Sequence, residues 1–276
     1  MTYAQSLKFG SSLCFGRKFD LDTLREFKSH GIDAVELSFS FDYYMNKLDF
    51  PKNRYQLAKI AEEAGVELWS IHLPFSRNLD ISHPSNELRA IALYTNRTLI
   101  EAAGDVGIKV AVLHPSSEPI SDEERPERLA RSREAIIMLQ EECDRHGLKL
   151  AVENLPRTCL CNRSEEMISL LAGTGAGVVF DTNHSLVEDS VSFLSALIDG
   201  GLDIYSLHIS DYDFTDERHR LPGDGINDWR GLLSQLERAG YGGPLMYEVP
   251  RKPKERDELT YDELAENMRR LAAGEI

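Results

Sequence analysis

Several features that mark particular classes of protein are missing from this 276-residue chain. No run approaches the roughly 18 apolar residues of a membrane-spanning helix. The N-terminal MTYAQSLKFG lacks the basic and then apolar layout of a secretory signal peptide, so we expect a cytoplasmic location. The four cysteines, Cys14, Cys143, Cys159 and Cys161, have neither the spacing of a disulfide framework nor that of a complete zinc knuckle, so we expect reduced thiols.

Positive charge is also scarce, because 31 Lys and Arg residues face 46 Asp and Glu residues and leave a net charge of −15. This balance disfavours DNA or another polyanion as a partner, since binding to phosphates draws on clustered basic side chains. Linkers and low-complexity tracts are absent from the sequence too. With 42% hydrophobic residues the chain can bury one large core, and we expect a single domain over residues 1–276.

What the sequence does contain is a regular alternation of short apolar runs and amphipathic helical segments. Segments such as LDTLREFKSHG and NRYQLAKIAEEAG have apolar residues near the 3.6-residue helical period and close at glycine. Eight strand–helix units in this length predict an α/β fold, the (β/α)8 or TIM barrel. A doubly wound open sheet is the alternative, but it usually carries a Gly-rich first turn, and SSLCFGRKFD is not one. The expected strands span about 7–15, 34–39, 66–74, 108–115, 148–155, 177–184, 204–211 and 243–249.

Histidine and acidic side chains end six of the expected strands. The C-terminal ends of barrel strands converge on one mouth, where active sites lie. A single histidine or glutamate at a strand end is usually a hydrogen-bonded core residue, but six such ends in succession are hard to obtain by chance. The residues are His72, His114, Glu153, Asp181, His208 and Glu248.

Four of these residues predict a metal site. If Glu153, Asp181, His208 and Glu248 face the barrel interior, strand alternation also points residues 151, 179, 206 and 246 inward. Buried carboxylates need a compensating cation or hydrogen bonds. An oxygen-rich donor set with one imidazole suits Mn²⁺, Mg²⁺, Co²⁺ or Zn²⁺.

Three further features bear on the predicted site. The stretch HISDYDFTDERHRLPGDG, residues 208–225, begins at His208 and is predicted to form a loop over the barrel mouth. Glu36 in VELSF is predicted to be either a cavity-lining residue or a structural carboxylate. Trp69 lies three residues before His72, so strict alternation points it toward the helical shell.

The order VEN, DTNH, HISD…PGDG and YEV is similar to that of the xylose-isomerase-like TIM barrels. That superfamily holds sugar and sugar-phosphate isomerases and epimerases, inosose dehydratase and endonuclease IV. The resemblance covers nearly the whole chain, from GIDAVELS to MYEV. In its tagatose-3-epimerase-like members a Glu, Asp, His, Glu set binds one divalent metal, and the matching positions here are Glu153, Asp181, His208 and Glu248. A histidine that touches the substrate is matched by His184.

The resemblance implies a divalent-metal-dependent sugar or sugar-phosphate isomerase or epimerase. Proton transfer would pass through a metal-stabilised enediolate, with Glu153 and Glu248 as acid and base. The metal would be Mn, Co, Mg or Zn, and the partner a small-molecule sugar or sugar phosphate. Such barrels often form homo-oligomers, although no apolar stripe in the sequence decides this. The implied substrate-binding residues are His184, His72, His114, Arg218 and His219, with Arg157 as an alternative to Arg218 for a distal hydroxyl or phosphate.

Two other activities stay open at this point. Endonuclease IV holds three zinc ions, and its longer ligand list is matched by additional candidates. Glu217 stands where that family has Asp, and Asp224 stands in its Gly-Glu-Gly turn. A keto-sugar or keto-inositol dehydratase is a close variant of the isomerase, because it also removes a proton next to a carbonyl. The additional metal candidates are His72, His114, His184, Glu217 and His219.

Overall fold

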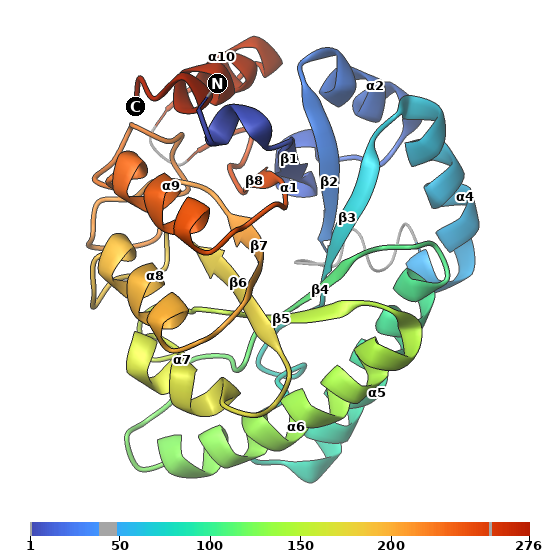
Figure 1. Ribbon diagram of the computed structural model, residues 1–276. Coiled ribbons are helices and arrows are strands. Elements are labelled where there is room, and N and C mark those ends of the chain that lie inside the picture. The colour runs from blue at the N-terminus through green and yellow to red at the C-terminus, as the bar shows by residue number, and fades with distance from the viewer. Residues whose placement is uncertain (1, 39–48, 254–255) are drawn as a thin grey trace.

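Eight parallel strands form one sheet that curls into a nearly closed barrel at the centre of the molecule (Figure 1). The computed structural model describes residues 2–38, 49–253 and 256–276. Neighbouring strands in the sheet follow the order β7-β6-β5-β4-β3-β2-β1-β8. All eight expected strands are confirmed; Phe39, the last residue of the second expected run, lies outside the described residues. The strands are β1 (Phe9–Ser12), β2 (Ile32–Ser38), β3 (Glu67–His72), β4 (Val110–Leu113), β5 (Lys149–Glu153), β6 (Gly177–Asp181), β7 (Ile204–His208) and β8 (Leu245–Tyr247).

The seam between β7 and β8 is the loosest part of the barrel wall among the described residues. Ile209 bridges Tyr247, its N–H donates to the carbonyl of Met246 at 2.7 Å, and its own carbonyl accepts from the N–H of Glu248 at 3.0 Å. These contacts follow the end of β7 instead of running along it. The circle of strands therefore closes only near the C-terminal mouth.

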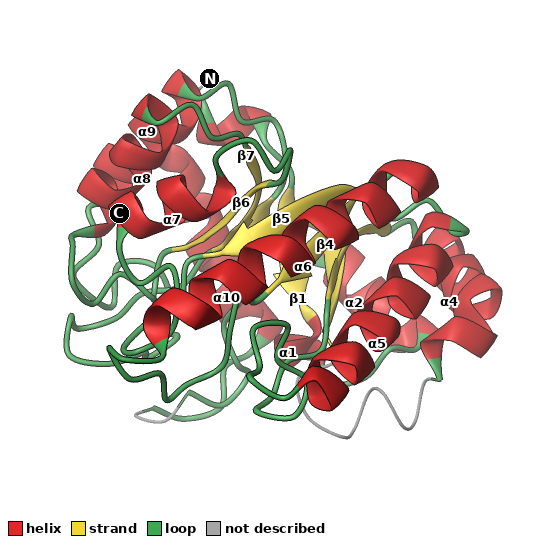
Figure 2. Cartoon of the chain, turned by 90° about the horizontal axis from the view of Figure 1, so that it is seen from below, coloured by secondary structure: helices red, strands yellow, loops and turns green. Residues whose placement is uncertain are grey.

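Helices surround the strands, as both views show (Figures 1 and 2). Glycine ends helices as the sequence predicts, since Gly65 and Gly147 follow two of them in the left-handed conformation at φ of 70° and 76°. Thr260 and Glu263 form a capping box at the start of the last helix. The helices are η1 (Ala4–Ser6), α1 (Leu13–Gly16), α2 (Leu21–Ser29), α4 (Phe50–Ala64), α5 (Asn86–Gly104), α6 (Arg125–His146), α7 (Ser164–Leu171), α8 (Ser190–Asp199), α9 (Trp229–Arg238) and α10 (Tyr261–Ala273).

Small and branched side chains fill the barrel below the mouth. Val110, Val112, Ala151 and Val179 form a buried cluster inside the ring of strands, separate from the larger core between strands and helices. This agrees with the expected inward direction of Ala151 and Val179. Their strands therefore present the next inward residue, two positions later, at the mouth.

Trp69 corrects one sequence-based expectation, because its side chain faces the barrel interior and not the helical shell. The pairing of β2 with β3 runs Val35 to Leu68 and then Glu36 to Ser70, so Trp69 is an extra residue in the register. Its indole Nε1 lies 3.3 Å from the hydroxyl of Ser206 and its ring packs against the inner cluster. Such a bulge re-aims side chains, which strict alternation does not anticipate.

No helix in the described part of the chain is long and apolar enough to cross a membrane. The four cysteines are free thiols, as expected from their spacing.

Candidate active site

Four strand ends bring their polar side chains to one point at the mouth of the barrel. Glu153 ends β5, Asp181 ends β6, His208 ends β7 and Glu248 directly follows β8. One ligand atom from each lies within 4.8 Å of those from the other three. His208 Nδ1 faces all three carboxylates, 3.0 Å from Glu153, 3.5 Å from Glu248 and 3.8 Å from Asp181. The structure therefore brings together the four residues expected to bind metal.

Two carboxylate oxygens of this group are buried without a hydrogen-bond partner, Glu153 Oε2 and Asp181 Oδ2. Glu153 Oε2 does lie close to two imidazole nitrogens, but not in hydrogen-bonding geometry. The other oxygen of Asp181 accepts from the N–H of Asn183 at 2.6 Å. Buried acceptors without donors are costly, and a cation between them would remove that cost. The donor set fits a divalent metal ion.

The pKa values of the metal-free site also indicate a place for a cation. Burial disfavours a charged His208, but Glu36, Glu248 and Glu153 outweigh it and hold the pKa of His208 well above its usual value. Burial, and then Glu248 and Glu153, raise the pKa of Asp181 well above its usual value. Burial opposes ionisation of Glu153, yet His208 and His114 keep the pKa of its carboxyl well below its usual value. Without a metal ion, protons bound to His208 and Asp181 therefore reduce the repulsion among the crowded carboxylates.

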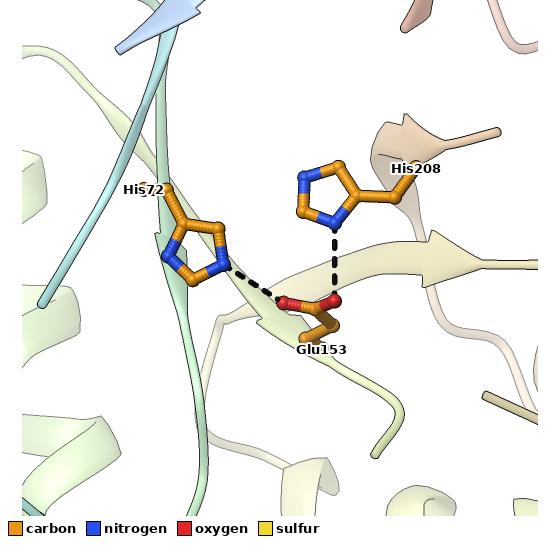
Figure 3. A group of neighbouring side chains, drawn as sticks. All are labelled: His72, Glu153 and His208. Carbon is orange, nitrogen blue, oxygen red and sulfur yellow. Dashed lines mark hydrogen bonds and ion pairs between the residues drawn. The ribbon is translucent and has the colours of Figure 1, made fainter. Parts of the chain in front are cut away.

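His72 and His114 approach Glu153 from β3 and from the end of β4. Their Nε2 atoms lie 3.3 Å and 3.0 Å from Glu153 Oε2, and His72 and His208 flank the carboxylate from two sides (Figure 3). Phe75 stacks on the His114 ring with 3.8 Å between centroids. His72, Glu153 and His208 are a second group with metal-binding spacing. Glu153 and His208 are therefore shared between the two groups.

His184, Glu217 and His219 form a third group with metal-binding spacing, closer to solvent than the first. His184 Nε2 lies 3.7 Å from Glu217, and its Nδ1 donates to the carbonyl of Asn154. Asn183 accepts hydrogen bonds from the backbone of the loop at 3.0 Å and 3.2 Å, which fixes His219 beside Glu248. The DTNH motif thus holds the loop after β7 over the mouth.

A cavity of about 470 Å³ opens above these groups. Its size lies in the range of small-molecule sites. His72, His114, Glu153 and Glu248 line its inner end and Phe75 forms part of its wall. Cys14 also lines the cavity, but burial raises the pKa of its thiol to about 12, so it is not a thiolate nucleophile at neutral pH.

The two arginines considered for the distal end of a substrate lie in different places. Arg157 lines the cavity and contacts Glu118, Asp216 and Glu217 at 2.9–3.1 Å, which links three loops across the mouth. Arg218 is not among the cavity-lining residues, and its Nε donates to the Asp213 carboxylate at 2.7 Å.

Asp211, which the sequence did not single out, organises the loop between β7 and α9. Its buried carboxylate accepts hydrogen bonds from the N–H groups of Tyr212, Gly223 and Asn227 and from the indole of Trp229, at 2.9–3.1 Å. At position 225 a Cβ atom would lie 2.3 Å from this carboxylate, so only glycine fits. The polarity of residues 208–225 therefore has a structural as well as a chemical origin.

Glu36 does not line the cavity. It is fully buried on β2, behind the His208 ring. Its Oε1 lies 3.0 Å from His208 Nε2, and its Oε2 accepts from the Ser70 hydroxyl at 2.7 Å. The alternative of a cavity-lining role is therefore wrong.

A barrel that gathers carboxylates and histidines at its C-terminal mouth belongs to the class of TIM-barrel proteins with a strand-end site. Residues 24–271 match the family described as xylose isomerase-like TIM barrel, and the chain belongs to that family. It is 25% identical over 239 residues to L-ribulose-5-phosphate 3-epimerase of Escherichia coli, covering 83% of this chain and 81% of the relative. An uncharacterised protein of Methanocaldococcus jannaschii is 26% identical over 250 residues, covering 88% and 83%.

Solved structures share the fold. A D-tagatose 3-epimerase-like protein superposes with a TM-score of 0.81 at 22% identity, with 97% of both chains covered. The IolI protein, solved with a bound zinc atom, gives 0.76 at 18% identity with the same coverage. A 3-keto-D-glucoside 4-epimerase from Escherichia coli gives 0.76 at 20%, covering 97% of this chain and 99% of that one.

Proposed function

We propose that this protein is a divalent-metal-dependent isomerase or epimerase of a sugar or sugar phosphate. The observation that carries the proposal is the convergence of four donor residues in which two buried carboxylate oxygens have no hydrogen-bond partner. Glu153, Asp181, His208 and Glu248 would hold the ion. The named epimerases among the relatives support the reaction class, and the zinc in the IolI protein supports use of a metal.

The two glutamates are the proposed proton carriers. When bound, the divalent ion would supply Lewis-acid stabilisation of the negative charge on the substrate carbonyl oxygen. Ionised Glu153 takes the proton from the carbon beside the carbonyl, and the C–H electron pair moves into the enediolate. Glu248, once it has taken up a proton from water, then gives that proton to the opposite face of the same carbon or to the neighbouring carbon.

Exposure distinguishes these carriers. The Glu248 side chain is 22% exposed, whereas Glu153 is 1% exposed. Glu248 therefore exchanges its proton with water between turnovers, and Glu153 does so slowly. His184 and His219 at the mouth and His72 and His114 at the inner end would orient hydroxyls, and Phe75 would pack against the apolar face of the sugar.

The proposal is tested by metal content and by exchange of substrate hydrogen with solvent. Protein purified without a histidine tag or chelator should contain about one divalent ion per chain, for which the four donors provide one site. Ketoses and ketose phosphates incubated in D₂O should gain deuterium beside the carbonyl. Glu153→Gln and Glu248→Gln should each lower kcat by about 10²–10⁴-fold, the usual contribution of a general acid or base. Glu142→Gln, on the outer helix α6, serves as the control. Full activity after exhaustive metal removal would contradict the proposal.

A second candidate rests on the groups around His72 and around His184, Glu217 and His219, which give the mouth spacing for more than one ion. This arrangement would suit a trinuclear-zinc phosphodiesterase of the endonuclease IV kind acting on abasic DNA. About three zinc ions per chain and cleavage of an abasic duplex would favour it over the sugar enzyme. A keto-sugar or keto-inositol dehydratase would instead show loss of water after the same proton removal.

A further inference from the structure

Glu36 is a buried carboxylate that has no role in the proposed proton transfer. Its side chain is 0% exposed on β2, and each of its oxygens has one partner. One oxygen faces His208 Nε2 at 3.0 Å, and the other accepts from Ser70 Oγ at 2.7 Å. A buried carboxylate is costly to maintain, so its exact pairing with a histidine at the site calls for a physical reason.

The bulge in β3 is what makes this pairing geometrically complete. With Trp69 as the extra residue, the register places Ser70, and not Trp69, opposite Glu36. The hydroxyl of Ser70 then donates to one oxygen of the carboxylate, while His208 Nε2 faces the other. Without the bulge Glu36 would lack its second donor.

The orientation of the His208 ring is fixed at the same time. Its Nδ1 lies 3.0 Å from Glu153, and its Nε2 points away from that carboxylate (Figure 3). Nδ1 also lies 3.5 Å from Glu248 and 3.8 Å from Asp181. The ring stacks on His72 with an interplanar angle of 11° and a centroid distance of 5.6 Å. A neutral imidazole carries its proton on one nitrogen and offers a lone pair on the other.

We propose that Glu36, held by Ser70, is a positioning residue that keeps the His208 proton on Nε2 and so presents the Nδ1 lone pair to the metal site. Glu36 acts through His208 and contacts neither substrate nor ion. A carboxylate hydrogen-bonded to the far nitrogen of a metal-binding histidine also increases the basicity of the ligating nitrogen. The inference rests on the proposed metal-dependent function.

The test compares metal affinity in four variants with the wild-type chain. Glu36→Gln keeps the size of the side chain and removes its charge, Glu36→Leu removes every acceptor, and Ser70→Ala removes the supporting hydroxyl. Glu142→Gln is the matched control, because Glu142 contacts His146 Nε2 at 3.1 Å on α6, outside the barrel. Dissociation constants for Mn²⁺ and Zn²⁺ are measured by calorimetry, with thermal unfolding as a check on folding.

The expected weakening of metal binding is about 10-fold for Glu36→Gln and about 100-fold for Glu36→Leu, the range found when such partners are lost. Ser70→Ala should weaken binding by less than about 10-fold, and the control should not change it. If Glu36→Leu does not fold, Glu36→Gln and Ser70→Ala carry the test. Wild-type affinity in a folded Glu36→Leu, or in both of the milder variants, would overturn the inference.

A second readout separates this inference from the proposed function. In protein labelled with ¹⁵N-histidine, the hydrogen-bonded Nε2–H of His208, assigned by its loss in His208→Gln, should be present in the wild type. It should be lost or shifted upfield in Glu36→Leu, in both zinc-loaded and metal-free protein. If the wild type binds no metal, the proposed function fails, and this signal still decides whether Glu36 positions His208. An unchanged signal in Glu36→Leu would overturn the inference.

Discussion

Replacing Asp211 by asparagine tests how the loop over the mouth is held. One carboxylate oxygen accepts from Tyr212 N and Asn227 N, and the other from Gly223 N and Trp229 Nε1. Whichever oxygen becomes an NH₂ group, two N–H donors then face another donor. A hydrogen bond to a charged group contributes about 1.5–3 kcal/mol, so the loss of two predicts a destabilisation of about 3–6 kcal/mol.

The assay is urea unfolding of the metal-free protein, followed by circular dichroism. Asp224→Asn is the control, because its carboxylate is 48% exposed and pairs with Arg256 at the surface, where an ion pair contributes at most about 1 kcal/mol. Asp211→Asn should also raise KM, since the same loop carries Glu217 and His219. A cost of less than about 1 kcal/mol for Asp211→Asn would refute the reasoning, because it would mean that the two displaced donors find other acceptors.

Three further outcomes are expected. The pKa values of His208 and Asp181 are raised in the folded protein, so both groups contribute stability. The contribution of each group is complete below its pKa in the unfolded chain, which for His208 is about 6.5. The melting temperature in the presence of chelator should therefore fall as the pH rises from 6.5 to 9, and an unchanged melting temperature would contradict this. Phe75→Ala should raise the KM for sugar more than it lowers kcat in steady-state kinetics, because stacking holds substrate in both ground and transition states. Asp80→Ala leaves Arg128, 5% exposed, without its buried partner, so denaturant unfolding should show a loss of about 3–5 kcal/mol, whereas a loss below about 1 kcal/mol would speak against burial of the pair.

The strands and their chemical ends were accessible from the sequence because both depend on local pattern. Apolar runs of strand length and glycine-closed helices repeat eight times, and the histidine or acidic residue that closes six of the runs falls at the mouth by the geometry of the barrel. The sequence alone therefore predicts a site formed by Glu153, Asp181, His208 and Glu248. Their expected roles remain proposals.

What the sequence could not provide depends on pairing between distant segments. Trp69 was placed on the wrong face because a bulge is a property of register between two strands, which alternation along one strand does not reveal. The role of Asp211 depends on donors up to 18 residues away in the chain, and that of Glu36 on a partner 172 residues away. Arg218 and Arg157 look equivalent as loop charges, and the folded loops alone distinguish them.

The seam of the barrel has a mechanical consequence. His208 stands on one side of the sparsely bonded junction between β7 and β8, and Glu248 stands on the other. An ion bound by both residues would cross-link β7 and β8 at the most sparsely bonded junction among the described strands. Amide exchange along both edges should then slow when the ion binds, far more than in β3 or β4. The residues that bind the ion would then also close the barrel.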